Sequence, residues 1–180
     1  MRELKDKIIA ITGGATGIGF ALAKSFGKDG AKIVIGEPRE AERQKAVEEL
    51  KNLDIEANET HLDVTDLESV KNFANFTCKS FGRVDILINN AGISGARGRI
   101  DKVDIDKAKK VFDVNFFGVW QGCAVFSKKM IEQGTESAIY NVGSENSLFI
   151  AVPNSVAYVA SKHAVFGLSE SLRNDLPDFI

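Results

Sequence analysis

The chain has 180 residues, of which 44% are apolar and 27% are charged. This balance is typical of a folded globular domain and excludes a disordered or collagen-like chain. Its 23 Lys and Arg residues nearly balance its 25 Asp and Glu residues, so the formal net charge is −2, and without a basic surface we expect no nucleic acid and no membrane among its partners.

The length fits a single domain, residues 1–180, that can form a core without disulfides. Its longest uninterrupted apolar run, Leu148 to Val152, is far shorter than the roughly 20 residues of a bilayer span. The N-terminal residues contain no apolar signal core. The two cysteines, Cys78 and Cys123, lack redox or metal spacing and are interpreted as small buried apolar residues. We therefore predict a cytoplasmic protein without a metal.

Short runs rich in Ile and Val alternate with longer segments of helical period along the whole chain. This order indicates successive βαβ units and a parallel sheet. The predicted strands are Lys7 to Thr12, Lys32 to Gly36, Glu56 to Asp63, Val84 to Asn89 and Ser137 to Val142. The predicted helices are Gly17 to Lys28, Arg39 to Leu50, Leu67 to Phe81, Asp104 to Gln133 and Ser155 to Asn174. The fold class is therefore α/β, a doubly wound, Rossmann-like parallel sheet of about five strands whose ligands bind at the carboxyl ends of the strands.

The turn after the first strand has the composition of a dinucleotide site. Residues 12–19 read TGGATGIG and lead directly into a helix. Glycines let the backbone approach a pyrophosphate, and the helix N-terminus offers free N–H groups to it. A tight turn without a ligand is the plainer alternative. A nucleoside triphosphate loop is disfavoured because no Gly-Lys-Ser/Thr sequence follows.

An acidic residue, Glu37, follows the second strand about 20 residues beyond the glycines. Such a side chain accepts hydrogen bonds from the adenosine ribose and repels a 2′-phosphate, which favours NAD over NADP. Arg39 and Arg43 follow closely. They could pair with a 2′-phosphate, or they could simply begin a solvated helix.

Further motifs follow along the chain. Together with the glycine turn, the motifs are Thr12-Gly13 with Gly17-Ile18-Gly19, Asp63-Val64, Asn89-Asn90-Ala91-Gly92, Asn115, Ser144, and Tyr158 with Lys162. In this order and spacing they resemble the short-chain dehydrogenase/reductases. The resemblance runs from residue 7 to the C-terminus, and the spacing of the glycines is similar to that of the shorter branch of this family.

The resemblance implies an NAD(P)-dependent oxidoreductase that moves a hydride between the cofactor and a small-molecule substrate, either a secondary alcohol or ketone or a sugar-type compound. It implies a catalytic tetrad of Asn115, Ser144, Tyr158 and Lys162. The cofactor contacts that it implies come from Gly13, Thr16, Gly17, Ile18, Gly19, Glu37, Asp63, Val64, Asn90, Ala91, Gly92, Tyr158 and Lys162. Without the resemblance, Asp63 could equally be a helix cap and Asn115 a buried polar group of a helix.

Tyr158 and Lys162 are four residues apart in a predicted helix and therefore lie on one face of it. A free phenol has a pKa of about 10, and a neighbouring cation lowers it toward the range of a general acid/base. Ser144 follows the fifth strand, where its hydroxyl can hold the substrate oxygen. Its separation from Tyr158 is one residue longer than is common in the family, so Ser147 is a weaker alternative donor. By resemblance, Asn115 holds a water that links Lys162 to solvent.

Two segments bear on the substrate. Residues 148–152 are apolar and form either a pocket wall or ordinary core. Arg97 and Arg99 could meet an anionic group, although solvated loop charges are commoner.

The sequence ends after the Tyr158 helix, where the family continues into further strands, so we expect the last strands of the family fold to be missing. The fifth strand would then be an exposed edge. The alternative function is therefore a non-catalytic dinucleotide-binding module, or an inactive fragment of a longer enzyme. Small residues in the long helix and the Tyr158 helix permit close helix packing. By resemblance these helices pair in a homodimer or homotetramer, although packing within the chain also accounts for part of this surface.

Overall fold

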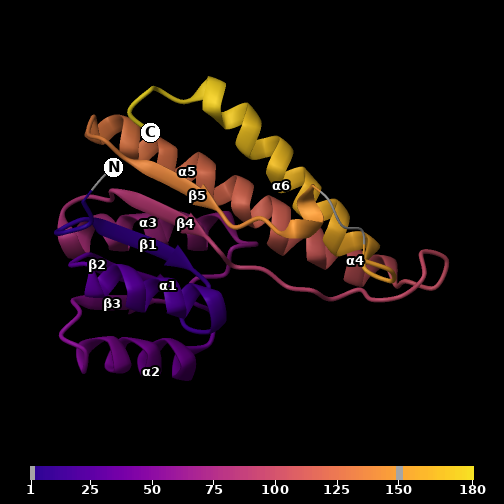
Figure 1. Cartoon of the computed structure of the whole chain (residues 1–180), viewed down its shortest axis with the longest axis horizontal. Helices are drawn as coiled ribbons and strands as arrows, with labels where there is room; N and C mark the ends of the chain where they lie inside the picture. The colour runs from indigo at the N-terminus through magenta and orange to yellow at the C-terminus, as the bar shows by residue number, and fades with distance from the viewer. Residues whose placement is uncertain (1–2, 149–151) are drawn as a thin grey trace.

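The computed structural model describes residues 3–148 and 152–180. The strands are β1 (Ile8–Thr12), β2 (Lys32–Gly36), β3 (Ala57–Thr60), β4 (Ile86–Asn89) and β5 (Ala138–Asn141). The α-helices are α1 (Gly17–Lys28), α2 (Glu40–Lys51), α3 (Leu67–Phe81), α4 (Ile105–Phe112), α5 (Gly118–Gln133) and α6 (Val156–Asp175). A π-helical turn, η1 (Asp113–Phe117), joins α4 to α5, and a short 3-10 turn, η2 (Glu145–Ser147), follows β5 (Figure 1).

The strands form one parallel sheet in the order β3-β2-β1-β4-β5, which confirms the predicted fold class. Ala10 of β1 lies between Val34 of β2 and Leu87 of β4 in the register of the sheet. Every residue of β1 and β4 is buried, because helices cover both faces of a parallel sheet. The order of the strands reverses between β1 and β4, and this reversal opens a crevice at their carboxyl ends.

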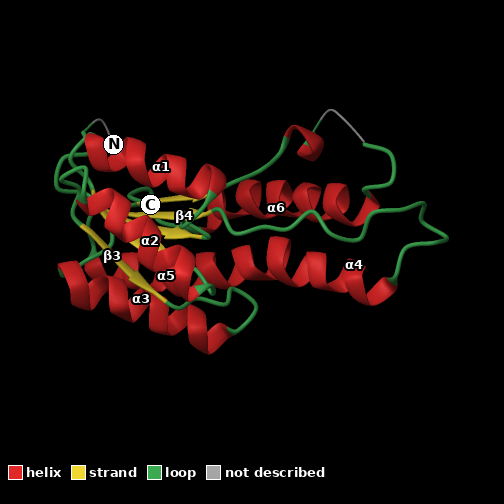
Figure 2. Ribbon diagram, turned by 90° about the horizontal axis from the view of Figure 1, so that it is seen from below, coloured by secondary structure: helices red, strands yellow, loops and turns green. Residues whose placement is uncertain are grey.

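Alternating side chains of the central strands supply two separate cores. Ile9 and Ile11 point to the layer formed by α1 and α2, whereas Ala10 points to the layer of α3 and α5. In the second layer, the Phe73 and Phe126 rings pack with their centroids 5.6 Å apart. Figure 2 shows the strands lying between α1 on one side and α3 on the other. The sheet therefore has the two-sided burial that its apolar strands require.

The region beyond the carboxyl ends of the strands extends from the sheet as an arm. It contains α4, the first turns of α6 and the loop that follows β4 (Figure 1). A small cluster of Ala96, Val111 and Ala157 packs these three parts together. A parallel bridge between Gly98 and Ser155 ties the loop to the start of α6. The arm therefore brings the N-terminal turns of α6 beside the segment that follows β4.

The predicted long helix, Asp104 to Gln133, is wrong as a single regular helix. It is divided by the π-helical turn at Asp113–Phe117, which contains the buried Asn115. A π-helical turn accommodates one extra residue and changes the direction in which the following side chains point. The apolar pattern of the segment predicted the helix, but this local insertion has no signature in that pattern.

The two edge strands are shorter than predicted, and β5 is an exposed edge as predicted. β3 covers Ala57–Thr60 rather than Glu56 to Asp63, so His61 lies beyond the strand and is exposed. β5 ends the sheet among the described residues and is only half-buried, with Tyr140 exposed. Cys123 is buried as predicted, whereas Cys78 is only half-buried. Edge strands have a pairing partner on one side only, and this shortens the ladder that each can form.

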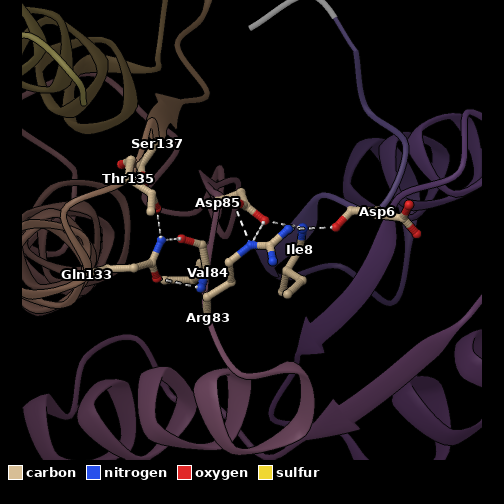
Figure 3. A network of polar contacts seen from close by, with 8 residues as sticks. All are labelled: Asp6, Ile8, Arg83, Val84, Asp85, Gln133, Thr135 and Ser137. Atoms are coloured by element: carbon tan, nitrogen blue, oxygen red, sulfur yellow. Dashed lines mark hydrogen bonds and ion pairs between the residues drawn. The ribbon is translucent and has the colours of Figure 1, made fainter.

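A buried carboxylate joins the elements at the amino ends of the strands, opposite the crevice. Asp85 accepts hydrogen bonds from the Ile8 N–H at 2.8 Å and from the Arg83 Nε at 3.0 Å. Arg83 also donates to the Asp6 carbonyl. Beside it, Gln133 of α5 bonds both backbone groups of Val84 (Figure 3). These contacts hold β1, β4 and α5 together at the end of the sheet that carries no site residue.

Replacing Asp85 by Ala should therefore lower the free energy of unfolding by about 2 kcal/mol, because the buried Ile8 N–H loses its acceptor. Urea denaturation monitored by circular dichroism measures the change. Asp101→Ala, which removes a carboxylate from an exposed pair with Arg99, is the control and should leave the midpoint unchanged. Equal midpoints for wild type and Asp85→Ala would contradict the structural role of Asp85.

Candidate active site

The glycine-rich turn between β1 and α1 forms one end of the site. Gly13 has φ +61°, a conformation that favours glycine, and its N–H donates to the Gly36 carbonyl at 2.8 Å. A Cβ at Gly19 would overlap the Gly13 carbonyl oxygen and the Asn90 amide nitrogen. No side-chain hydrogen bond caps the first turn of α1 at Thr16. The turn therefore leaves N–H groups at the helix N-terminus available to an anion.

Thr12 and Asn90 fasten the end of β1 to the end of β4. The Thr12 hydroxyl accepts from the N–H groups of Asn90 and Ala91, each at 3.0 Å. In return, the Asn90 side-chain amide donates to the carbonyls of Thr12 and Gly13, also at 3.0 Å. The sequence motif contains Thr12, but no role was predicted for it. A polar residue at the end of an otherwise apolar buried strand is the signal that identifies it.

Glu37 lies at the end of β2 and is 3% exposed, although it carries a carboxylate. Its Oε1 accepts from the Arg39 Nε at 2.7 Å and from the Arg39 N–H at 3.2 Å. Arg39 also reaches the Thr16 hydroxyl at 3.4 Å. The hydrogen bond to Glu37 raises the pKa of Arg39 above its usual value. Arg43 is directed elsewhere, to Glu59 and to the Pro38 carbonyl, so only one of the two predicted arginines faces the site.

Asp63 and Val64 form the turn after β3. The Asp63 carboxylate accepts from the Thr65 N–H at 2.9 Å and from the Thr65 hydroxyl at 2.8 Å, and these bonds lower the pKa of Asp63. The alternative that Asp63 caps the next helix is wrong, because Asp66 occupies that position and accepts from the Glu68 N–H. Gln121 of α5 donates to the Val64 carbonyl at 3.1 Å and fixes the turn from behind.

Tyr158 and Lys162 lie on the first turns of α6 and face the same pocket as the glycine turn. Lys162 is 5% exposed, and its Nζ donates to the Val142 carbonyl at 2.7 Å. Burial lowers the pKa of this ammonium group. Tyr158 is half-buried one turn before it. The structure thus brings together the two side chains that the helical spacing placed on one face.

Asn115 lies in the π-helical turn and is completely buried. Its Oδ1 accepts from the Ile93 N–H at 2.8 Å, and its Nδ2 donates to the Ile93 carbonyl at 2.9 Å and to the Ser161 hydroxyl at 3.1 Å. The Ser161 hydroxyl donates in turn to the Tyr158 carbonyl at 2.7 Å. Asn115 therefore connects the segment after β4 to the helix that carries Tyr158. Both N–H donors of its side-chain amide take part in this connection.

Ser144 follows β5 and is half-buried, and its N–H donates to the Ser147 hydroxyl at 3.1 Å. Ser147 is 4% exposed and closes the short turn η2. Ser147 does not line the main pocket, and this position, with its burial, argues against its predicted role as an alternative donor to substrate. Val142 and Gly143, directly before Ser144, are the residues of this segment that line the pocket.

One pocket of about 670 Å³ collects most of the predicted site residues. Those that line it are Gly13, Thr16, Ile18, Glu37, Asp63, Val64, Asn90, Ala91, Gly92, Tyr158 and Lys162. The predicted residues Gly17, Gly19, Asn115 and Ser144 lie in adjoining segments and are not part of its wall. Residues without a predicted role complete the wall: Pro38, Leu62, Ile93, Ser94, Val114, Val142 and Gly143. Most of these wall residues are adjacent in the sequence to motif residues, and this adjacency could have been used to predict them.

The predictions about the substrate have mixed outcomes. Leu148 and Val152 are exposed, and the rest of the predicted apolar segment, residues 149–151, lies outside the described residues. Arg99 forms an exposed ion pair with Asp101, which is the plainer of its two interpretations. Arg97 lines a second cavity together with Gly98 and Asn154, beside the start of α6. Leu148, Val152, Arg97 and Arg99 do not line the main pocket.

Within residues 3–148 and 152–180, no cluster of His, Cys, Asp and Glu is suited to a metal. Burial raises the pKa of the Cys123 thiol to about 11 and also raises that of Cys78, so neither is activated as a nucleophile. In the same described ranges, no helix is long and apolar enough to cross a membrane.

Comparisons with known proteins agree with this geometry. A model of the family described as short chain dehydrogenase matches residues 7–179. Short chain aldehyde dehydrogenase 1 of Euphorbia lathyris is 36% identical over 97% of this chain and 60% of its own length. Secoisolariciresinol dehydrogenase of Forsythia intermedia is 37% identical over 99% of this chain and 63% of its own length. The chain therefore spans about three fifths of these curated relatives.

Solved structures show the same fold. A short chain dehydrogenase/reductase of Burkholderia phymatum in complex with NAD superposes with a TM-score of 0.93 at 34% identity, over 98% of this chain and 62% of that one. An NAD+-bound xylitol dehydrogenase gives a TM-score of 0.93 at 28% identity, over 99% of this chain and 68% of that one.

The contact between Glu37 and Arg39 makes a prediction about cofactor preference. Glu37→Ala should raise the affinity for NADPH relative to NADH at least about tenfold, because it removes the negative charge and leaves the Arg39 guanidinium free for a 2′-phosphate. The double variant Glu37→Ala/Arg39→Ala should lose that gain. Fluorescence titration with both reduced cofactors measures the ratio. Arg43→Ala, whose guanidinium pairs with Glu59, is the matched control; an unchanged ratio in Glu37→Ala would remove Glu37 from the ribose site.

Proposed function

The chain belongs to the short-chain dehydrogenase family, and from that premise we propose that its main pocket binds NAD and transfers a hydride between the cofactor and a secondary alcohol or ketone, or a sugar-type substrate. The observation that carries the proposal is that one pocket is lined both by the glycine turn with Glu37 and by Tyr158 with Lys162. The first pair of features suits a dinucleotide, and the second suits proton transfer to oxygen.

The residues of the pocket fit a dinucleotide along its length. A Cβ at Gly17 would meet no protein atom within 4 Å, so the turn is open at this position and its backbone can approach a pyrophosphate at the α1 N-terminus. Glu37 retains its second carboxylate oxygen for the ribose hydroxyls, because Arg39 bonds Oε1. Asp63 and Val64 lie where the adenine would follow, and Asn90 to Gly92 lie toward Lys162. The NAD-bound relatives support this assignment.

NAD supplies hydride acceptance and donation when it is bound; the proton is the task of the protein. We assign that proton to the Tyr158 hydroxyl. Lys162 lies one helical turn beyond Tyr158 and lines the same pocket, and its ammonium group would stabilise the negative charge that develops on the phenol oxygen as the proton leaves. The Val142 carbonyl holds the Lys162 ammonium group at a definite point of the pocket wall. Ser144 would contribute its hydroxyl to the substrate oxygen from the segment after β5.

Asn115 acts in this scheme as a positioning residue. Both N–H donors of its side-chain amide are used by Ile93 and Ser161, so a water on the path from Lys162 to solvent would have to donate to an oxygen of Asn115. Through Ser161, Asn115 also holds the turn of α6 on which Tyr158 lies.

Tyr158→Phe should lower turnover at least about a thousandfold while leaving NADH binding within about twofold of wild type, because the ring remains and only the transferable proton is removed. Steady-state assays over a panel of secondary alcohols, polyols and ketones measure turnover, and fluorescence titration measures binding. Full activity in Tyr158→Phe would refute the mechanism. If the wild-type chain binds NADH but turns over no member of the panel, the alternative of a non-catalytic binding module gains support.

We further propose that the protein forms a homodimer through the outer faces of α5 and α6. Trp120 of α5 and Phe166 of α6 are exposed, as is Phe117 at the end of η1, and a groove of about 500 Å³ runs between the helices. Phe116 and Trp120 stack edge to face at 6.0 Å and form its aromatic wall. Exposed aromatic clusters beside a groove are typical of protein interfaces. A second dimer contact would give the predicted homotetramer.

Trp120→Glu should weaken the self-association at least about a hundredfold, because it buries a charge in the apolar contact. Light scattering after size-exclusion chromatography reports the mass. Leu53→Glu, at the end of α2 and far from the groove in sequence, is the control and should keep the wild-type mass. A monomeric wild type at micromolar concentration would overturn the interface.

A further inference from the structure

A line of polar side chains crosses the molecule behind the pocket wall that carries Lys162. Asn89 of β4 donates from Nδ2 to the Asn141 Oδ1 of β5 at 2.8 Å, and the Cys123 Sγ of α5 lies 3.4 Å from the same oxygen. Asn141 donates from Nδ2 to the Ser169 hydroxyl of α6 at 3.0 Å. Ser169 donates to the Val165 carbonyl at 2.8 Å. The line therefore joins two strands and two helices.

The direction of each hydrogen bond in this line is determined by the last one. Because the Ser169 hydroxyl proton goes to its own helix, its oxygen must accept from Asn141. The Asn141 Oδ1 then faces Asn89, which turns its Nδ2 toward Asn141. The Asn89 Oδ1 is therefore buried without a hydrogen-bond partner. It lies so close to Gly122 that a Cβ at that position would overlap it. An unpartnered buried acceptor costs stability, so this arrangement is not the one that stability alone favours.

The residue after Asn141 connects this line to the pocket. Val142 donates its N–H to the Asn89 carbonyl at 2.9 Å and accepts from the Lys162 Nζ at 2.7 Å. The end of β5 thus holds α6 at two points, Lys162 and Ser169, which are seven residues apart in the sequence. Seven residues are close to two helical turns, so both side chains lie on one face of α6. Together with the contact of Ser161 with Asn115, these two attachments determine where the helix lies along its axis.

The apolar packing of α6 differs along its length. Its fully buried residues are Ala157, Ser161, Lys162 and Val165, and farther along the helix Leu168 and Leu172 pack against the cluster of Val119, Cys123 and Val165. In the turns that carry Tyr158 and Lys162, Ala157 and Ser161 are small, and small side chains specify the axial position of a helix only weakly. Hydrogen bonds to the strand are directional and can specify it.

We propose that Asn141 and Ser169 are positioning residues of the proton-transfer site, which hold Lys162 against the Val142 carbonyl and so hold it beside Tyr158. Neither residue lines the pocket. The proposal rests on the function proposed above, in which Tyr158 and Lys162 handle the proton.

The test compares Ser169→Ala with Ser169→Thr, which keeps the hydroxyl, and with Glu170→Gln, an exposed change on the next residue. Acetylation of Lys162 by acetic anhydride, measured by mass spectrometry from pH 7 to 11 with the exposed Lys128 as an internal reference, needs no turnover. Lys162 should be acetylated about fivefold faster in Ser169→Ala than in wild type, which is the effect expected for the loss of one hydrogen bond. Ser169→Thr and Glu170→Gln should match wild type, and Lys128 should not change in any variant.

The pH profile of alcohol oxidation gives the second readout. A Lys162 that is less well held is better hydrated, which relieves the lowering of its pKa by burial. The limb of the profile that depends on the Lys162 ammonium group should therefore move to higher pH in Ser169→Ala, with kcat reduced, whereas Ser169→Thr should match wild type. Asn141→Ala should give the same changes more strongly, provided that it folds.

A Ser169→Ala protein that is merely less stable, with Lys162 labelling and the pH profile as in wild type, would overturn the proposal. Failure of the proposed function is distinguishable, because full activity in Tyr158→Phe removes the proton role whatever the labelling shows. If the chain shows no turnover, the labelling of Lys162 alone decides: a faster reaction supports the positioning role, and an unchanged one refutes it.

Discussion

The mutual hydrogen bonds of Thr12 and Asn90 are the constraint on which the rest of the site depends. Parallel strands end at one edge of the sheet, and the chain must leave β1 and β4 in opposite directions at the point where the strand order reverses. Each departure frees backbone groups that would otherwise be buried without partners. Thr12 and Asn90 satisfy four such groups between them with side chains, so the two segments can separate and leave a pocket between them.

The polar residues around this crevice divide into those that build it and those that face into it. Thr12, Asn115 and Ser161 direct their hydrogen bonds to the backbone or to one another. Glu37 and Lys162 are charged and buried in the pocket wall, each with a partner beside it. Burial of a charge lowers stability unless the charge is paired. These two groups therefore indicate where a polar ligand could form further hydrogen bonds. They lie at the ribose end and at the proton-transfer end of the proposed cofactor path.

The sequence predicted those parts of the molecule that repeat a simple period. β1, β2, α1 and α3 match their predicted limits closely, because a buried apolar strand or an amphipathic helix bounded by glycine and polar caps carries its own signal. The π-helical turn at Asp113–Phe117 was missed because it depends on the contacts of Asn115 with Ile93 and Ser161. These contacts join distant segments, and no local pattern encodes them. The ion pair of Glu37 with Arg39 was not predicted either. The sequence indicates a separate effect of each side chain on a 2′-phosphate, and it does not show that the two side chains contact each other.

Lys162 shows why helix α6 has to be held more firmly than its packing requires. An ammonium group that is nearly excluded from water gains only part of its hydration back from one carbonyl, and burial lowers its pKa accordingly. Tyr158 and Lys162 belong to the same helix and move together, whereas the Val142 carbonyl that holds Lys162 belongs to the segment after β5. A small axial movement of α6 would therefore lengthen the bond from Lys162 to Val142 and move both side chains relative to the rest of the pocket. The attachment through Ser169 and Asn141, like that of Ser161 to Asn115, limits this motion.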